Sequence, residues 1–245
     1  MKSALCLLFA VACGPVCAEA VLRVGGFLVA PMMMGEGDQA LYGALPEFLQ
    51  NEVAPKAGVK LIFLPVMSFP RAKQALKEGS LDVLLISGNS THSGMQRASW
   101  AWLAPRSFLA VTPASPWRKV TSLQELSGKR IGWVGGSQLP PEFKDIAVDW
   151  DFSFSPTWQS VNLKKLQLGR LDAVFFQNPY SAIWWGRKDG MPLRLLDLPL
   201  PAEKFAFGYA QRADAAAVAR FDQAAAAAFA GDKFKRWLES YAAQR

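Results

Sequence analysis

Short apolar runs alternate along this chain with segments of helical periodicity. Several runs are apolar at consecutive positions, as in Val83–Ile86 and Ala173–Phe176, which is typical of strands buried between helices. The alternation therefore favours the α/β class. Residues 213–245 show i, i+3, i+4, i+7 spacing and are predicted as two packing helices separated at Gly231. The predicted strands are Leu22–Gly25, Lys60–Val66, Asp82–Ser87, Phe108–Thr112, Arg130–Val134, Asp172–Phe176 and Phe205–Ala210.

Two segments, Leu76–Val83 and Leu166–Ala173, are near copies of each other. Each contains a glycine where a helix would end in the left-handed conformation, followed one residue later by Leu-Asp and then by an apolar run. Glycine alone is common at helix ends, but here the sequence on both sides is shared. The repeat predicts two lobes of related architecture.

The N-terminus has the three-part pattern of a secretory signal. Lys2 precedes the apolar stretch Ala4–Cys13, and small residues follow up to Ala20. The apolar stretch is about half of the roughly 20 residues that a membrane span needs. We expect residues 1–20 to be a signal peptide, cleaved after Ala18 or Ala20, and the mature protein to be soluble and periplasmic.

All three cysteines, Cys6, Cys13 and Cys17, lie inside this segment. A mature chain that begins at Val21 would contain none, so we expect neither disulfides nor thiolate metal sites. A lipoprotein would keep Cys13 as its lipidated residue, but Ala10-Val11-Ala12 before it lacks the usual leucine.

Composition excludes disordered and fibrous classes, because 51% of the residues are hydrophobic and 19% are charged. The formal net charge of +7 could indicate nucleic acid or an anionic surface. The basic residues are scattered, however, as in Arg118-Lys119 and Lys164-Lys165, with no basic block. We therefore expect a solvated basic surface and no nucleic-acid partner.

Candidate catalytic and metal-binding groups are few. The chain has one histidine, His92, in a polar loop, so a Ser-His-Asp arrangement would need that residue as its base. Methionines 32–34 beside Glu36 and Asp38 could suggest a soft-metal site, but consecutive side chains cannot all face one ion, and we interpret the segment as a flexible apolar loop. We predict no catalytic residue, no metal and no cofactor.

A ligand site is predicted at the carboxyl ends of the strands, where open α/β sheets bind small molecules. The turn after Arg130–Val134 begins with two glycines and could present main-chain N–H groups and Ser137 to an anion. The aromatic, amide, hydroxyl and arginine side chains at these ends could stack on and hydrogen-bond to a small polar or anionic molecule. The candidate binding residues are Phe27, Phe69, Arg71, Ser87, Asn89, Thr91, Arg97, Ser137, Gln138 and Gln177.

In the order and spacing of several short motifs, the sequence resembles the periplasmic solute-binding proteins of ABC importers, polar amino acid type. The resemblance implies two α/β lobes joined by a hinge of crossing strands, which close on a small ligand. We expect residues 21–106 with 208–245 to form the first lobe and 107–207 the second. The motifs are Leu22–Gly25, Phe69–Arg71, Leu76–Asp82, Arg97, Trp102–Pro105, Ser122–Gly132 and Gly169–Val174.

The resemblance also assigns roles to single residues. It implies that Phe69 stacks on the ligand, that Arg97 pairs with a ligand carboxylate, and that Ser137 and Gln138 donate from the second lobe. Gln177 stands where amino acid receptors carry an acidic residue for the α-amino group. An amide forms no ion pair with an ammonium group, so a neutral or anionic metabolite is favoured over an ordinary α-amino acid. We expect the tryptophans to pack mainly in the core or on the lobe surfaces, with one lining the cleft.

The resulting prediction is a monomeric, non-enzymatic receptor that binds a small molecule and docks on the membrane permease of an ABC importer. Two alternatives remain open at this point. One is an enzyme on the same scaffold, such as a lyase resembling cyclohexadienyl dehydratase, which would use Glu36, Asp38 or His92. The other is a sensory protein that presents its ligand to a membrane receptor.

Overall fold

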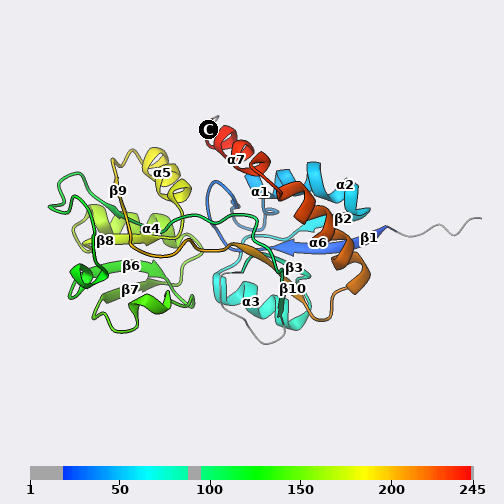
Figure 1. The fold of residues 1–245 in the computed structure, drawn as a ribbon, viewed down its shortest axis with the longest axis horizontal. Helices are drawn as coiled ribbons and strands as arrows, with labels where there is room; N and C mark the ends of the chain where they lie inside the picture. Colours follow the sequence, from blue (N-terminus) through cyan, green and yellow to red (C-terminus); the bar gives the residue numbers. More distant parts are fainter. Residues whose placement is uncertain (1–18, 88–94, 244–245) are drawn as a thin grey trace, which may run out of the picture.

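The computed structural model describes residues 19–87 and 95–243. Two lobes lie side by side and are connected by two crossing segments of the chain (Figure 1). Each lobe is built around a five-stranded mixed sheet with helices packed against it. Within the described ranges, no helix combines the length and apolar character that a membrane span requires.

The sheet of the first lobe has one antiparallel strand inserted between a parallel group and an edge strand. Across the sheet, the strands are β2 (Val59–Phe63), β1 (Ala20–Gly25), β3 (Val83–Ser87), β10 (Ala206–Ala210) and β4 (Met95–Arg97). β1 pairs in parallel with β2 and β3, so Val24 lies between Phe63 and Val83. β10 runs antiparallel to both of its neighbours. Val83–Ile86 of β3 are all buried, which explains this continuous apolar run.

Helices cover both faces of this first sheet. They are α1 (Ala44–Phe48), the π-helical turn η1 (Leu49–Val53), α2 (Ala54–Ala57), α3 (Phe69–Glu78), α6 (Ala215–Phe229) and α7 (Lys233–Ala243). α3 lies on one face, and α2 and α6 lie on the other (Figure 1). The two predicted C-terminal helices are confirmed as α6 and α7, and Gly231 between them has φ +83°. Phe48 packs against Phe229 and Phe234 and ties these helices to α1.

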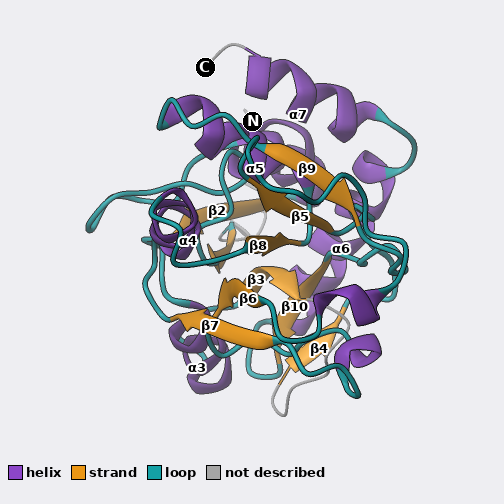
Figure 2. Cartoon of the chain, turned by 90° about the vertical axis from the view of Figure 1, so that its left-hand side faces the viewer, coloured by secondary structure: helices purple, strands orange, loops and turns teal. Residues whose placement is uncertain are grey.

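The second lobe repeats the strand order of the first. Its strands are β7 (Asp149–Ser153), β6 (Arg130–Val134), β8 (Ala173–Phe176), β5 (Phe108–Val111) and β9 (Arg194–Asp197). Figure 2 looks onto this lobe from its outer end and shows the five strands in that order. As in the first lobe, the second strand pairs in parallel with both neighbours and the fourth is antiparallel. The helical segments are η2 (Leu123–Leu126), η3 (Pro141–Phe143), α4 (Trp158–Gln167) and α5 (Pro179–Lys188).

The sequence repeat corresponds to the same local structure in both lobes, a glycine that ends a helix and an aspartate that binds the neighbouring strand. The glycines after α3 and α4, Gly79 and Gly169, have φ of +77° and +68°, as the left-handed helix end requires. The aspartate that follows accepts a hydrogen bond from the main-chain N–H of an arginine on the neighbouring strand. Asp82 does so with Arg23, and Asp172 with Arg130, each at 2.8 Å.

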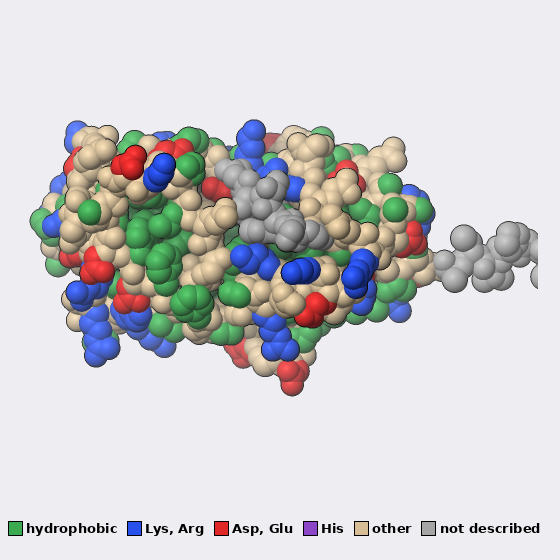
Figure 3. All heavy atoms as spheres, turned by 90° about the horizontal axis from the view of Figure 1, so that it is seen from below, with side chains coloured by type: hydrophobic (Ala, Val, Ile, Leu, Met, Phe, Trp, Pro, Cys, Tyr) green, Lys and Arg blue, Asp and Glu red, His purple; other side chains and the backbone are tan. Residues whose placement is uncertain are grey.

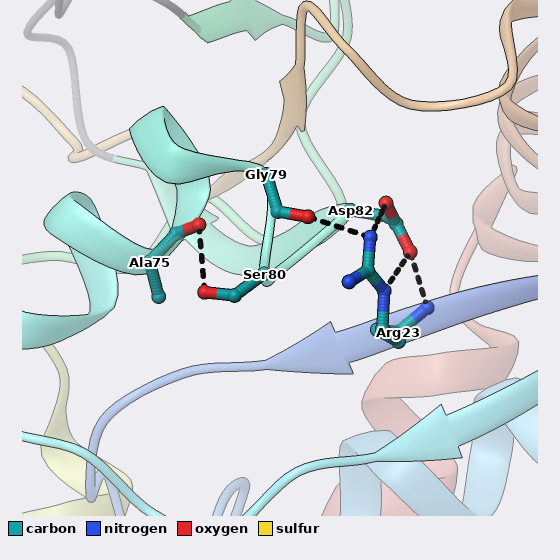
Figure 4. Close-up of polar contacts among 5 residues, drawn as sticks. All are labelled: Arg23, Ala75, Gly79, Ser80 and Asp82. Atoms are coloured by element: carbon teal, nitrogen blue, oxygen red, sulfur yellow. Dashed lines mark hydrogen bonds and ion pairs between the residues drawn. The ribbon is translucent and has the colours of Figure 1, made fainter.

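In the first lobe this local structure has more hydrogen bonds, because the Arg23 side chain also donates (Figure 4). Its Nη2 lies 2.7 Å from Asp82 Oδ1 and donates to the Gly79 carbonyl, while its Nε donates to Asp82 Oδ2. The Asp82 side chain is 8% exposed, whereas that of Arg23 is 42% exposed. In the second lobe, Arg130 Nε instead donates to Asp149.

The hinge consists of two antiparallel segments, 98–107 and 198–206, that cross between the sheets (Figure 1). Main-chain hydrogen bonds join them along this path: Trp102 N–H donates to the Phe205 carbonyl at 2.8 Å, and Leu198 N–H donates to the Ser107 carbonyl at 3.1 Å. The second crossing segment leads into β10 at Ala206.

The predicted strands match seven observed ones, with shifts at their ends. The largest shift is at Lys60–Val66, because β2 ends at Phe63. Beyond it, Leu64 N–H still donates to the Val24 carbonyl, and Pro65 pairs with Ala40. Three strands were missed: β4, β7 and β9. All three are edge strands that are short or contain polar residues, so they lack the continuous apolar signal of a buried strand.

The segment with three methionines is not the flexible loop that we expected. Met32 and Met33 are fully buried, and Met34 is 6% exposed. Main-chain pairing of Val29 with Met33 and of Met34 with Tyr42 folds the segment back on itself. Its thioethers fill the core of the first lobe, which methionine does well because its side chain is unbranched.

Candidate functional site

A cavity of about 440 Å³ lies between the two lobes. Its walls come from the carboxyl ends of strands in both sheets and from the second crossing segment, as expected for open α/β sheets. This volume is in the range of natural small-molecule sites. The lining residues are Phe27, Val29, Phe69 and Ile86 of the first lobe; Ser107, Trp133, Val134, Ser137–Glu142, Trp158, Gln159 and Phe176–Asn178 of the second; and Leu200–Glu203 with Phe205.

On the first-lobe side, two predicted residues form an aromatic wall. Phe69 is the first residue of α3, and Phe27 follows β1. Their rings meet edge to face, with centroids 4.8 Å apart and an interplanar angle of 88°. Phe69 is 9% exposed, so its orientation is fixed by packing. The pair offers an apolar wall to a guest.

On the second-lobe side, three further predicted residues, Ser137, Gln138 and Gln177, line the cavity. Ser137 and Gln138 belong to the turn after β6, and Gln177 follows β8. Asn178, next to Gln177, accepts a hydrogen bond from Ser181 N–H and so begins α5. This cap fixes the main chain at the point where Gln177 reaches the cavity.

Two candidate arginines lie outside the cavity lining. Arg71 is exposed on α3 and is not part of the lining. Arg97, on β4, is also outside the lining, and its Nη2 donates to the Lys204 carbonyl at 2.8 Å. β4 pairs with β10, which directs Arg97 to the second crossing segment. Ser87 is the last residue of β3. Asn89, Thr91 and His92 lie outside the described residues.

A second aromatic wall was missed by sequence reasoning. Trp133, Trp158 and Phe176 line the cavity from β6, the start of α4 and the end of β8. The rings of Trp133 and Trp158 are 5.2 Å apart at 77°, and those of Trp158 and Phe176 are 5.8 Å apart at 35°. Two tryptophans rather than one thus reach the cleft, because these separate segments converge there. Their local sequence resembles that of core tryptophans.

Three N–H groups in this wall have no hydrogen-bond acceptor among the described residues: Trp133 Nε1, Trp158 Nε1 and Gln159 Nε2. All three atoms are buried. A buried donor without a partner costs about 1–3 kcal/mol, so most such groups in proteins are satisfied. The three residues line the cavity through other atoms, because these N–H groups are inaccessible from it.

The charged groups of the lining are carboxylates. Glu142, in η3, is exposed, and Glu203 is half-buried in the second crossing segment. Among the described residues that line the cavity, none is lysine or arginine. On the face seen in Figure 3, basic side chains are spread over both lobes with acidic ones between them. The described lining therefore offers aromatic surfaces, neutral polar side chains and two carboxylates to a guest.

The lobes touch each other beside the cavity. Lys73 on α3 donates from Nζ to the carbonyl of Gly136, 3.1 Å away, and lies over the Phe69 ring at 4.8 Å. Pro70 packs against Gly136 so closely that a Cβ atom there would lie 2.7 Å from Pro70 Cγ. The start of α3 and the turn after β6 therefore form a direct contact across the cleft.

Replacing Lys73 with methionine is expected to weaken ligand binding about threefold. The variant removes one exposed charged hydrogen bond across the lobes while keeping the aliphatic part of the side chain, and exposed charge contacts contribute about 0.2–1 kcal/mol. Isothermal titration calorimetry with a bound metabolite measures the change. Lys77→Met, on the exposed last turn of α3, is the control; an equal loss in both variants would contradict a role for the Gly136 contact.

The structure is similar to those of several solved proteins. Over 91% of this chain and 98% of the other, the structure matches an ancestral arginine-binding protein bound to arginine, with a TM-score of 0.71 and 20% sequence identity. The chain has the two-lobed fold of periplasmic binding proteins. The same fold relates it to the substrate-binding protein of an amino acid ABC transporter, with a TM-score of 0.69, 18% identity and coverage of 91% and 99%.

The fold also occurs in a domain of a larger protein. The periplasmic VFT2 domain of Bordetella pertussis BvgS matches with a TM-score of 0.72 and 16% identity, over 91% of this chain and 94% of that one. No protein-family model matches the sequence, and no curated protein sequence matches it significantly. The structural matches thus confirm the expected fold class, two α/β lobes with a cleft.

Proposed function

We propose that this protein is a periplasmic receptor that captures a small polar metabolite between its lobes and presents it to the permease of an ABC importer. The observation that carries the proposal is the cavity of about 440 Å³ between the lobes, with Phe27 and Phe69 on one side and Ser137, Gln138 and Gln177 on the other. A site divided between two lobes gains its full set of contacts only when they are together, so ligand binding favours closure.

The crossing segments support hinge closure as the mechanism. Among the described residues, two stretches of chain join the sheets, and they pair through main-chain hydrogen bonds such as that between Phe205 N–H and the Leu103 carbonyl. Rotations at a few residues in such segments can open the lobes without disturbing either sheet. The direct contact of Lys73 with Gly136 would then separate on opening and re-form on closure.

The enzyme alternative gains no support from the placement of its candidate residues. Glu36 and Asp38 are exposed and do not line the cavity, and His92 lies outside the described residues. An anionic ligand would need basic side chains in the cleft, but the candidates Arg71 and Arg97 lie outside the lining. We therefore propose a monomeric, non-catalytic receptor, exported by residues 1–20, whose ligand is held by stacking and neutral hydrogen bonds.

Thermal unfolding tests this proposal. The purified mature protein should show a rise in Tm of about 5–10 °C with its metabolite at about 100 times Kd, because binding to the folded state alone adds about 2.7 kcal/mol to the free energy of unfolding. A metabolite library and the small molecules released from the denatured protein, identified by mass spectrometry, supply the candidates. If no compound raises Tm, the receptor function is wrong.

A sensory receptor is the second candidate, favoured by the match to the periplasmic VFT2 domain of BvgS. Both roles require the same cleft, so binding measurements do not distinguish them. Uptake of the radiolabelled metabolite by cells with and without the gene does so. Loss of uptake on deletion supports the importer, and unchanged uptake with an altered transcriptional response supports the sensory role.

A further inference from the structure

One edge of the second-lobe sheet is open and carries a row of aromatic side chains. Among the described strands, β7 pairs with β6 alone and forms the edge of its sheet (Figure 2). Trp150 and Phe152 of β7 point to the same face of the sheet, and their rings are 6.2 Å apart at 22°. Phe154 follows directly after the strand. Phe152 is 40% exposed and Phe154 is 64% exposed, so a partner can reach this row.

The main-chain groups between these side chains also point outward. At the start of β7, the Asp149 N–H donates to the carbonyl of Lys129, just before β6, at 2.9 Å. At its end, the Ser153 carbonyl accepts a hydrogen bond at 2.8 Å from the residue just after β6. In a parallel pair, every second residue binds the neighbouring strand. The N–H and C=O groups of Trp150 and Phe152 therefore face away from β6, where a further strand can bind them.

The residues of this edge are complementary to a second copy of the same edge. In an antiparallel pair centred on Phe152, the two Phe152 side chains lie opposite each other, and Trp150 of each copy lies opposite Phe154 of the other. Aromatic pairs directly opposite one another stabilise a sheet. On the other face, Asp151 lies opposite Ser153, so no like charges meet. This register also aligns the outward main-chain groups of both copies.

Other registers of such a pair are disfavoured by the flanking residues. A centre nearer the start of β7 places Asp151 opposite its own copy or opposite Asp149, and like charges directly opposite each other are destabilising. A centre nearer the end places Pro156 opposite Trp150 or Phe152, and proline has no N–H to donate. The charges and the proline thus select the register centred on Phe152.

We infer that two copies of this chain associate through their β7 edges, antiparallel and centred on Phe152, so that the two second-lobe sheets form one continuous sheet. The contact is symmetric and therefore closed at two copies. A contact between two short strands is smaller than the roughly 1,200 Å² of stable complexes, so the receptor stays monomeric when dilute. The inference goes beyond the proposed function, because neither β7 nor Phe154 lines the cavity.

Sedimentation equilibrium of the wild-type protein without residues 1–20 tests for the association. Between 10 µM and 1 mM, values chosen as roughly 0.01 and 1 times a Kd of about 1 mM, the weight-average mass should rise roughly 1.5-fold. A mass that stays at that of the monomer up to the higher concentration would overturn the inference, whatever other partner the edge might bind.

Two lysine variants locate the contact. Phe154→Lys should weaken the association about tenfold, because it removes two aromatic pairs from each dimer and places a charge at the edge. Leu168→Lys is the control, since Leu168 is 67% exposed on the same lobe but follows α4 instead of β7. Equal effects of the two variants, or no effect of Phe154→Lys, would contradict a contact through β7. Circular dichroism and Tm confirm that each variant is folded.

Cysteine variants test the register. All native cysteines lie within residues 1–20, so the shortened protein has none. Phe152→Cys places two thiols directly opposite each other, with Cα atoms about 5.5 Å apart, which a disulfide can bridge. In Phe154→Cys they are displaced by four residues, about 14 Å. Under mild oxidation with diamide, Phe152→Cys should form the linked dimer at least tenfold faster, although Phe154 is the more exposed residue. Equal rates, or faster linkage of Phe154→Cys, would show that the register is wrong.

Discussion

Replacing Gly136 with alanine is expected to lower the affinity for the bound metabolite between about tenfold and a hundredfold. Gly136 has φ +79°, and an added Cβ would lie 2.7 Å from Pro70 Cγ in the opposite lobe. The proline ring is rigid, so the lobes would have to separate to relieve the overlap. Overpacking of this kind costs about 1–3 kcal/mol, and the cost falls on the closed state that binds the ligand. Isothermal titration calorimetry measures the loss.

Gly169→Ala is the matched control for this prediction. Gly169 has a similar φ of +68°, but a Cβ there would have no atom within 4 Å. Both variants therefore strain the main chain by a similar amount, about 1 kcal/mol, and should lower Tm alike. Only Gly136→Ala should lower affinity. Equal affinities would show that this contact does not form in the closed state.

Replacing Asp82 with alanine is expected to lower the free energy of unfolding by about 2–3 kcal/mol. Asp82 is buried and accepts three hydrogen bonds from Arg23, one from the main chain and two from the guanidinium group. Removing it leaves the Arg23 N–H without its acceptor. The loss stays below that of a fully buried ion pair because the Arg23 side chain is 42% exposed and can be hydrated. Urea unfolding measures the difference.

The sequence repeat supplies the control. Asp172→Ala removes the equivalent aspartate of the second lobe, which accepts from the main-chain N–H of Arg130 but not from its side chain. Asp172 is exposed, so its loss should cost about 1 kcal/mol or less. Asp82→Asn, which keeps an acceptor oxygen but not the charge, should fall between the two. Equal losses for Asp82→Ala and Asp172→Ala would show that the guanidinium bonds contribute nothing.

Much of the fold could be predicted because its signals are local. Continuous apolar runs mark β3 and β8, each flanked by strands on both sides, and the Gly-x-Leu-Asp repeat marks the helix end before each of them. The edge strands β4, β7 and β9 were missed. An edge strand forms by pairing with one strand that is distant in sequence. This pairing leaves little pattern in the residues of the edge strand itself.

The candidate site was predicted less completely. Phe27, Phe69 and Gln177 follow strands and line the cavity, as the rule for α/β sheets predicts. Arg71 and Arg97 lie equally close to strands in sequence but outside the lining. The direction of a side chain depends on helix rotation and strand pairing, which proximity to a strand does not reveal. The tryptophans of the second wall gave no signal of their own, because core tryptophans have the same apolar neighbours.

The sequence by itself determined the α/β class, the two related lobes and the positions of the strand ends that face the cleft, because these depend on periodicity and on short-range contacts along the chain. Only the tertiary structure decided that Trp133, Trp158 and Gln159 share one cavity wall, and that Gly136 meets Pro70 across the lobes. The first arrangement depends on how β6 and α4 pack within the second lobe, and the contact of Gly136 with Pro70 depends on how the hinge places the two lobes.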